Sequence, residues 1–274
     1  MGNLLVRNNQ IITFNGKVFG YTPPPPPIAS TTPVAGISYT NGLPNDWNVM
    51  KEIGQLISDA SNSITANTTG AIYVNKGNSW AYKITPGDTT MANGFQYAVM
   101  GFNNYQLTNI SNYGGKNIYA GLTFGMVDCC ASFQMNSSNT NGGGWGICLM
   151  KTQNMEEILI EGMPRTMAQI KTPYYVYNGS FMQYSDDYMF LPAEKEVFGT
   201  RTYSPSGEAS ALTQYAYYKN GGSKIKKIDG SAVIWWLRSV YSSNPAGFCS
   251  VDTDGGASYY PAGGVSGTAP CFCV

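Results

Sequence analysis

The residues that could carry out acid–base or nucleophilic chemistry are few in this sequence. The chain has 274 residues and no histidine, although histidine is the commonest general base at neutral pH and the commonest metal ligand. Its absence excludes the catalytic pairs in which histidine activates a serine or a cysteine. Catalysis would therefore have to depend on carboxylates, as in a glycan hydrolase.

Candidate carboxylates lie in two places. Glu156, Glu157 and Glu161 fall on one predicted helix, and Asp186 and Asp187 fall in a predicted loop. A glycosidase needs two carboxylates on opposite sides of the scissile bond, about 5 to 9 Å apart. Glutamates this close on one helix more often form a solvated face. We therefore predict that the protein is not an enzyme, and a carboxylate-based glycan hydrolase is the less favoured alternative.

The six cysteines follow no metal-binding or disulfide pattern. They show neither the paired Cys-x-x-Cys spacing of zinc sites nor a regular disulfide framework. We expect mostly free, buried thiols, and a bridge from Cys129 or Cys130 to a C-terminal cysteine is the alternative for an oxidised chain. The cysteines are Cys129, Cys130, Cys148, Cys249, Cys271 and Cys273.

Residues 252–256 read Asp-Thr-Asp-Gly-Gly and look like part of a calcium loop. The later bidentate glutamate of an EF-hand is missing, so a turn is the simpler interpretation. We predict no metal ion and no cofactor.

The composition indicates binding through neutral polar and aromatic groups. Charged residues make up 12%, and 16 basic residues balance 16 acidic ones, so no nucleic acid partner is expected. The polarity comes from Asn, Ser, Thr and Gly together with 20 tyrosines, a composition typical of adaptable recognition surfaces. No apolar run is long enough to cross a membrane, and residues 1–7 do not read as a secretory signal peptide.

Three segments are expected along the chain. In residues 1–22, two short β-prone runs flank Asn15-Gly16, which predicts a hairpin. Because one hairpin alone is marginal in water, this segment is predicted to attach to a larger assembly. Residues 23–44 begin with five prolines and are predicted to be a stiff linker. Residues 45–274 form the predicted ligand-binding domain.

The ligand-binding domain mixes helical and strand patterns. Asn45 or Asp46 can cap a helix whose apolar residues recur at helical spacing as far as Ile64. Asn154 and Glu157 resemble a capping box. The further predictions are an exposed turn at 141–144, a helical turn after Pro192, a helix over 208–219 and a buried strand over 232–237. Without regular strand–helix alternation, this mixture predicts an α+β fold with short antiparallel strands.

Three blocks carry a resemblance to a known family. They are Phe-Leu-Pro-Ala-Glu-Lys-Glu-Val-Phe-Gly at 190–199, Tyr-Tyr-Lys-Asn-Gly-Gly-Ser at 217–223 and Trp-Trp-Leu-Arg-Ser at 235–239. Together they resemble C-type-lectin-like, formylglycine-generating-enzyme-like domains, and within these the variable proteins of diversity-generating retroelements. Residues 1–27 also look like the leader of tail proteins in phages of gut Bacteroidetes. The resemblance implies a C-type-lectin-like fold over 45–274 with a variable region at about 240–270.

In such proteins, adenine-directed mutagenesis rewrites the variable region. From asparagine codons it cannot produce Lys, Glu, Gln, Met or Trp, and residues 240–274 contain none of these five types. The chain departs from the family pattern at its last residues, which contain no arginine. The calcium-binding and sugar-binding motifs of animal lectins are also absent, so calcium-dependent sugar binding is not carried over.

The predicted contact surface lies mostly in this region. Tyrosine provides a large contact area while losing few torsions, and small residues let neighbouring rings reach the ligand. Because residues 248–254 alternate like a strand, some of these side chains are expected to face the core. Arg238 is expected to bond a backbone carbonyl or a carboxylate, and one of Trp235 and Trp236 is expected to be buried. The predicted ligand-binding residues are Tyr241, Ser242, Ser243, Asn244, Phe248, Ser250, Asp252, Asp254, Ser258, Tyr259, Tyr260, Pro261 and Arg238.

From these features we predict a phage tail adhesin that acts outside the cell as part of the virion. Its predicted ligand is a bacterial cell-surface protein or glycan. Phage tail or fibre proteins are predicted to hold residues 1–22, and a homo-oligomer, with a trimer favoured, would sum weak contacts into high avidity. The alternative from a different class is a structural tail component with no ligand of its own.

Overall fold

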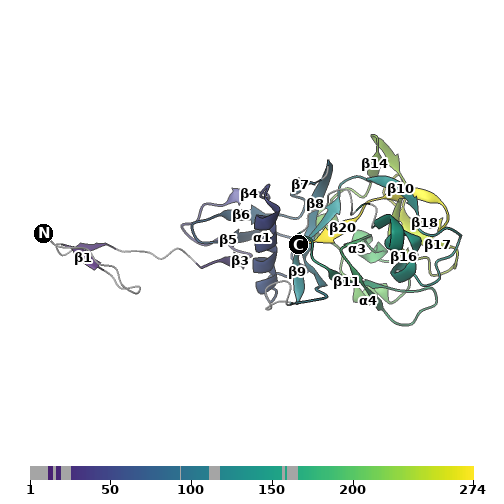
Figure 1. Cartoon of the computed structure of the whole chain (residues 1–274), viewed down its shortest axis with the longest axis horizontal. Helices are drawn as coiled ribbons and strands as arrows, with labels where there is room; N and C mark the ends of the chain where they lie inside the picture. Colours follow the sequence, from purple (N-terminus) through teal and green to yellow (C-terminus); the bar gives the residue numbers. More distant parts are fainter. Residues whose placement is uncertain are drawn as a thin grey trace.

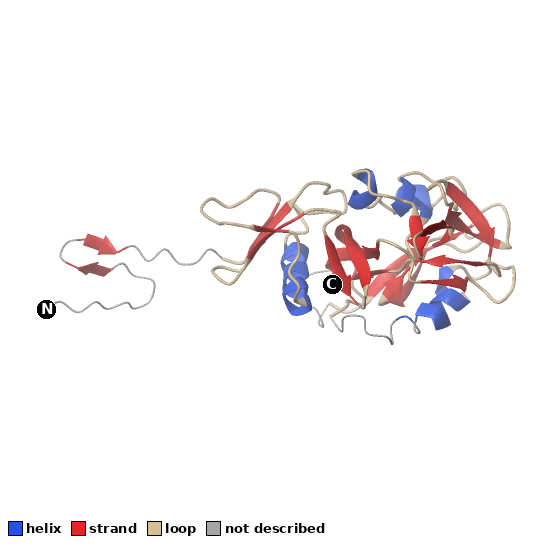
Figure 2. Ribbon diagram, turned by 90° about the horizontal axis from the view of Figure 1, so that it is seen from above, coloured by secondary structure: helices blue, strands red, loops and turns tan. Residues whose placement is uncertain are grey.

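The computed structural model describes residues 12–14, 17–19, 26–92, 94–110, 118–155, 158 and 166–274. Within them the chain forms sheets of mostly antiparallel strands with a few helices (Figure 2). The predicted α+β class is therefore confirmed. Strands β1 (Ile12–Phe14) and β2 (Lys17–Phe19) pair antiparallel, which confirms the hairpin. The turn residues Asn15 and Gly16, and most of the proline run, lie outside the described residues.

The first sheet after the proline run has the order β3-β5-β6-β4. Its strands are β3 (Ile28–Ser30), β4 (Thr40–Asn41), β5 (Ile72–Asn75) and β6 (Ala81–Ile84). The linker prediction for residues 23–44 is wrong from Ile28 onward, because β3 pairs with β5 and β4 pairs with β6. Backbone hydrogen bonding to a later part of the chain placed these Ser/Thr/Pro/Gly-rich residues in a sheet, which their composition did not predict.

Helix α1 (Trp47–Asp59) lies between this sheet and the central sheet (Figure 1). The Asp46 carboxylate accepts a hydrogen bond of 2.8 Å from the Asn48 backbone N–H, so the predicted cap is confirmed. Met50, Ile53 and Ile57 form its buried face. The helix ends at Asp59, so Ile64 is buried but lies beyond it.

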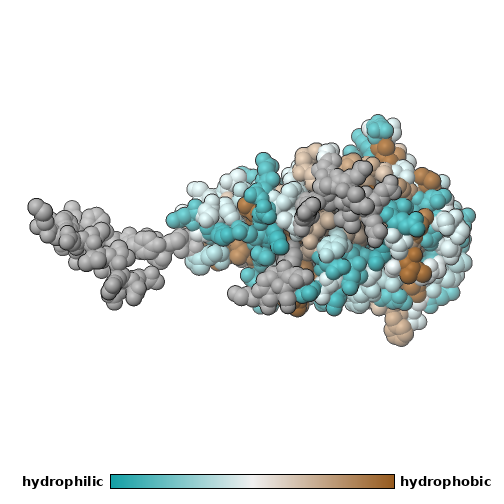
Figure 3. Space-filling view, viewed as in Figure 1, coloured by the Kyte–Doolittle hydropathy of each residue, from teal (hydrophilic) through white to brown (hydrophobic). Residues whose placement is uncertain are grey.

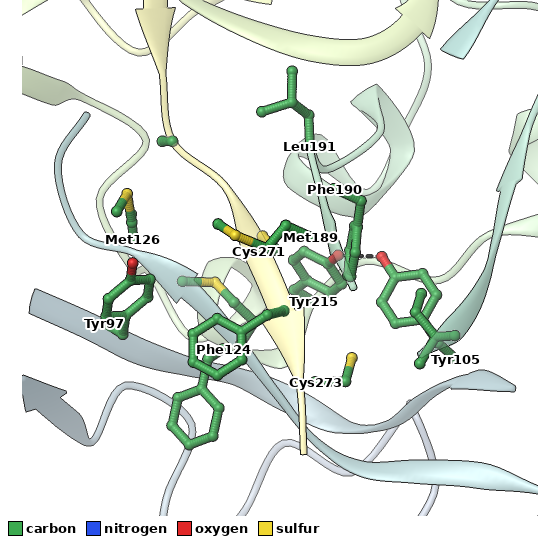
Figure 4. Close-up of a cluster of buried hydrophobic side chains, with 14 of the residues drawn as sticks. Tyr97, Tyr105, Phe124, Met126, Met189, Phe190, Leu191, Tyr215, Cys271 and Cys273 are labelled. Atoms are coloured by element: carbon green, nitrogen blue, oxygen red, sulfur yellow. Dashed lines mark hydrogen bonds between the residues drawn. The ribbon is translucent and has the colours of Figure 1, made fainter. Parts of the chain in front are cut away.

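The central sheet has the order β13-β20-β9-β8-β7. Its strands are β7 (Thr89–Ala92), β8 (Phe95–Gln106), β9 (Tyr119–Met126), β13 (Met189–Phe190) and β20 (Cys271–Cys273). The C-terminal strand β20 is inserted between β13 and β9, and Figure 4 shows Cys271 and Cys273 among the buried side chains. Phe272 stacks on Phe124 with 5.3 Å between ring centroids.

Helix α1 packs closely on the central sheet because two glycines allow it. A methyl group added to Gly121 would lie 1.9 Å from the Gly54 carbonyl oxygen, and one added to Gly54 would lie 2.6 Å from the Val274 carbonyl oxygen. Both distances are shorter than any side-chain contact allows. Gly54 and Gly121 therefore set the separation between helix and sheet.

The outer sheet has the order β10-β19-β16-β17-β18. Its strands are β10 (Ala131–Gln134), β16 (Trp235–Val240), β17 (Gly247–Val251), β18 (Ala257–Pro261) and β19 (Val265–Thr268). Trp235 and Trp236 are both fully buried. The predicted strand over 232–237 is confirmed from Trp235 onward, whereas Ala232 is exposed on β15 (Ser231–Val233), which pairs with β14 (Lys226–Ile228).

Short helices connect these sheets. Helix α3 (Glu194–Phe198) confirms the helical turn after Pro192. The predicted helix over 208–219 is broken into α4 (Glu208–Ala211) and α5 (Ala216–Lys219). The break has a tertiary cause: the Tyr215 backbone N–H bonds the Glu196 carbonyl at 2.9 Å instead of a helical partner.

Three further sequence predictions fall in the segment 141–187. Asn154, one half of the predicted capping box, ends the π-helix η3 (Met150–Asn154), which follows the 3₁₀ turn η2 (Trp145–Ile147). Its predicted partner Glu157 lies outside the described residues, as do Glu156 and Glu161. Asp186 and Asp187 are not in a loop but on β12 (Gln183–Asp187), paired with β11 (Ile170–Tyr174). Residues 141–144 do form a turn, but Asn141 is buried rather than exposed.

The cysteines are free, and all except Cys130 are buried. This confirms the prediction of mostly free, buried thiols. Burial raises the pKa of Cys271 to about 12 and that of Cys129 to about 12. The reactive thiolate form is therefore disfavoured at both sulfurs.

Candidate ligand-binding surface

Three tyrosines from separate segments meet at the surface, and we call them the tyrosine cluster: Tyr203, Tyr241 and Tyr259. The rings of Tyr241 and Tyr259 stack with 4.1 Å between centroids, and the Tyr203 ring meets Tyr259 edge-on at 5.2 Å. Tyr259 is 45% exposed. Rings that support one another lose little further freedom when a ligand contacts them, which favours recognition.

The loop that carries Tyr241 is held from beneath by Asn141. The Asn141 side-chain amide lies 3.3 Å from the carbonyl oxygen of Tyr241, 3.0 Å from that of Asn244 and 2.7 Å from that of Gly247. Because Asn141 is fully buried, these bonds are shielded from competing water. One side chain thus fixes the course of the loop between β16 and β17.

The segment that carries Tyr203 is held by a buried carboxylate, that of Glu194. Its two oxygens accept hydrogen bonds from the backbone N–H groups of Thr202, Tyr203 and Ser204 at 2.8–3.1 Å. Charge-assisted bonds of this kind are stronger than neutral ones. The Tyr203 carbonyl oxygen in turn accepts bonds from the Ser242 backbone N–H at 2.9 Å and the Ser242 hydroxyl at 2.8 Å, which joins the two segments.

Glu194 belongs to a buried charge network, defined as Glu194, Glu196, Glu208 and Arg238. Arg238 on β16 is fully buried and forms a bidentate pair with Glu196 on α3, with N–O distances of 2.6 and 2.7 Å. It also donates to the carbonyl oxygens of Pro173 and Leu191, each at 2.8 Å. Burial alone lowers the pKa of Arg238, but the Glu196 carboxylate outweighs this and the net shift is upward.

Glu208, like Glu194, has no direct cationic partner among the described ion pairs. It accepts a hydrogen bond of 2.9 Å from the Ser239 hydroxyl. Burial raises the pKa of Glu208 to about 7, against the lowering effect of Arg238. The network therefore holds one carboxyl that is protonated over much of the acidic range.

The structure divides the predicted ligand-binding residues into two groups. Phe248, Ser250 and Arg238 are buried, so predicting them as contact residues was wrong: β17 is covered along its whole length, and Arg238 serves the charge network. Arg238 does bond a carboxylate and backbone carbonyls, as predicted. The other predicted residues are exposed or half-buried: Tyr241, Ser242, Ser243, Asn244, Asp252, Asp254, Ser258, Tyr259, Tyr260 and Pro261.

These accessible residues do not all share one face. Tyr259 and Tyr260 are neighbours on β18 and therefore point to opposite sides of the sheet. Tyr259 joins the tyrosine cluster, whereas the Tyr260 ring packs at 5.7 Å from that of Trp236. On the face shown in Figure 3, hydrophobic residues lie in small groups between hydrophilic ones. Recognition at the tyrosine cluster would depend on aromatic rings and neutral polar groups.

Sequence reasoning missed Tyr203, Asn141 and Glu194. Tyr203 lies outside the predicted variable region and reaches it only because Glu194 folds its segment back. Asn141 reads as part of a glycine-rich turn. The one available signal for Glu194 was the acidic block at 194–196, in which two glutamates flank a lysine in an otherwise apolar stretch. The family resemblance did not reveal that these glutamates are buried.

Among the described acidic residues considered for metal binding or hydrolysis, Asp187, Asp252 and Asp254 are engaged in local bonds. The Oδ1 atoms of Asp252 and Asp254 accept the backbone N–H groups of Thr253 and Gly256 at 2.7 and 2.8 Å, as in a turn. Asp187 accepts the Trp145 indole N–H at 2.9 Å and pairs with Lys151 at 3.1 Å. Among the residues that the structure describes, no group of three or more potential metal ligands occurs.

Comparison with known families gives a match for one part of the chain. Residues 151–274 match a family model described as a domain of unknown function, DUF6273. The match includes the tyrosine cluster and the whole buried charge network, but not Asn141. No curated protein and no solved structure matches the chain. No helix among the described residues is long and apolar enough to span a membrane.

Proposed function

We propose that this protein is a non-enzymatic ligand-binding protein that recognises a bacterial surface protein or glycan through the tyrosine cluster. The observation that carries the proposal is that three partly exposed rings converge from residues 203, 241 and 259. Buried bonds from Asn141 and Glu194 fix the backbone beneath them. A preorganised aromatic surface on a rigid base is the arrangement that reduces the entropic cost of binding.

The finer fold assignment and the biological setting belong to the same proposal. We propose a C-type-lectin-like fold. Its support is that β9 and β20 are adjacent in the central sheet, while the long segment between them in the sequence consists of short strands and loops. The setting is a phage tail adhesin in the virion, attached to tail or fibre proteins through residues 1–22. A homotrimer would raise avidity by presenting several clusters together.

The test compares two tyrosines of equal exposure. Tyr259 is 45% exposed and Tyr188 is 46% exposed, so Tyr188→Ala is a matched control for Tyr259→Ala. We expect Tyr259→Ala to weaken binding to host cells by about tenfold or more, as a central aromatic contact does. Tyr188→Ala should bind like the wild type. Pull-down of the labelled full chain with bacterial cells measures both.

Two outcomes would contradict the proposal. Equal binding by both variants would show that the tyrosine cluster makes no contact with the ligand. If the wild-type chain binds no cells of any susceptible strain, the alternative of a structural tail component is favoured. Circular dichroism of each variant confirms that a loss of binding does not come from unfolding.

A further inference from the structure

A cavity of about 170 Å³ lies away from the tyrosine cluster, between β8, the β11–β12 hairpin and the segment after α4. Its polar lining residues are Asn104, Gln106, Lys171 and Thr213, and Tyr119 and Tyr184 supply aromatic walls. Small-molecule sites usually measure about 300 to 1,000 Å³. This smaller cavity would hold one ring rather than a chain of several.

The floor of the cavity carries little net charge. Tyr105 and Glu196 form it, and the Glu196 carboxylate is neutralised by Arg238 at 2.6 Å and accepts the Tyr105 hydroxyl at 2.7 Å. The Tyr105 hydroxyl also bonds the Tyr215 hydroxyl, as the dashed line in Figure 4 shows. A ligand with a full charge would therefore gain no strong partner at the floor.

The rim is also close to neutral. Lys171 on β11 is directly opposite Asp186 on β12, and both side chains are exposed. Opposite charges in this register attract each other across the strands. Lys171 thus offers hydrogen-bond donors without a large excess of positive potential, so the rim does not select an anion.

The accessible polar groups of the lining accept hydrogen bonds as well as donate them. The Gln106 amide carries both a donor and an acceptor, and the Thr213 hydroxyl acts as either. These groups pair with hydroxyl groups in either direction, which favours a neutral, hydroxylated occupant.

We propose that this cavity binds a single uncharged, hydroxylated ring, such as one hexose unit of a glycan. The C–H face of the ring would lie against Tyr119 or Tyr184, because these hydrogens are attracted to the negative face of an aromatic ring. Asn104, Gln106, Lys171 and Thr213 would bond its hydroxyl groups. This site is separate from the tyrosine cluster and does not depend on the proposed function.

The experiment titrates the full chain with glucose, galactose, mannose and N-acetylglucosamine, followed by saturation-transfer NMR. We expect one of them to bind with a Kd of about 1 mM, typical of a single weakly held ring. Ala66 also lines the cavity, so Ala66→Trp should fill it and weaken binding by about tenfold or more, while Ala66→Ser should leave it unchanged. Tyr259→Ala should bind the sugar like the wild type.

Three results would overturn this inference. One is the absence of saturation transfer from every sugar tested. Another is sugar binding of wild-type strength by a folded Ala66→Trp variant. If the tryptophan prevents folding, Lys171→Met is used instead, and sugar binding of wild-type strength by that variant would overturn the inference. The third is stronger binding of glucuronate than of the neutral hexoses, which would assign an anion site. A loss of cell binding in Tyr259→Ala with sugar binding retained would separate this site from the tyrosine cluster.

Discussion

The neighbouring strands β17 and β18 belong to the same predicted variable region, yet their surroundings differ. All five residues of β17 are buried, and the strand lies between β16 and β18. Strand β18 forms the edge of the sheet, where Tyr259 and Pro261 are exposed. Sequence change that serves recognition is therefore compatible with β18 and its flanking loops, whereas β17 must retain its packing. Proximity in the chain does not make two strands equally free to vary.

The largest expected effect separates these two strands directly. Phe248 on β17 is fully buried, so Phe248→Ala should lower the free energy of unfolding by about 3 to 5 kcal/mol through loss of burial and formation of a cavity. Tyr259→Ala on β18 should lower it by only about 1 to 2 kcal/mol, through loss of its two ring contacts. Urea denaturation measures both. Similar losses for the two variants would show that β18 is as structurally constrained as β17.

The next effect concerns the charge network that supports the surface without being part of it. The pKa of Glu208 is raised from 4.5 to about 7, so between these pH values the folded chain keeps a proton that the unfolded chain has released. Stability from this group is complete below pH 4.5 and declines as the pH rises to about 7. At about 1.36 kcal/mol per pKa unit, the loss is about 3 kcal/mol.

Glu208→Gln tests this pH dependence, because glutamine keeps an acceptor for Ser239 but does not titrate. Between pH 5 and pH 7.5, the wild type should lose about 2 kcal/mol relative to the variant, measured by chemical denaturation. A constant difference between the two proteins over this range would show that Glu208 does not titrate there.

The smallest of these effects concerns the loop between β16 and β17. Asn141→Ala removes the donor to three carbonyl oxygens and should cost about 1 to 3 kcal/mol, because those acceptors are left buried. Asn220 is an exposed asparagine that bonds the Thr69 carbonyl at 2.8 Å, so Asn220→Ala is the control and should cost less. Hydrogen exchange of the backbone amides in Asn141→Ala should be faster than in the wild type over 241–247, and its rate should be unchanged over 257–261. Faster exchange over both segments would mean that the sheet itself depends on Asn141.

Local signals in the sequence predicted local structure well. The cap at Asp46, the hairpin around Asn15-Gly16 and the helical turn after Pro192 each depend on residues within a few positions. The helix over 208–219 failed because its interruption depends on a bond from Tyr215 to Glu196. Strands β3 and β4 were missed for the same reason, since their partners β5 and β6 lie more than thirty positions away.

The candidate surface was predictable in composition but not in geometry. Most of the predicted residues are accessible, because they lie in loops or on the edge strand β18. The strand alternation at 248–254 predicted that some side chains would face inward, but not that the entire strand β17 would be covered. Tyr203 could not be found from the sequence, because its position depends on three backbone bonds to the buried Glu194.

The insertion of β20 between β13 and β9 has a consequence for the order of synthesis and folding. Cys271 and Phe272 pair with Phe190 and Met189 on one side and with Gly125 and Phe124 on the other. Strands β13 and β9 therefore cannot be joined until residues 271–273 have left the ribosome. By then the residues of the tyrosine cluster have already been translated. Each new chain therefore presents them to chaperones and proteases before its central sheet closes.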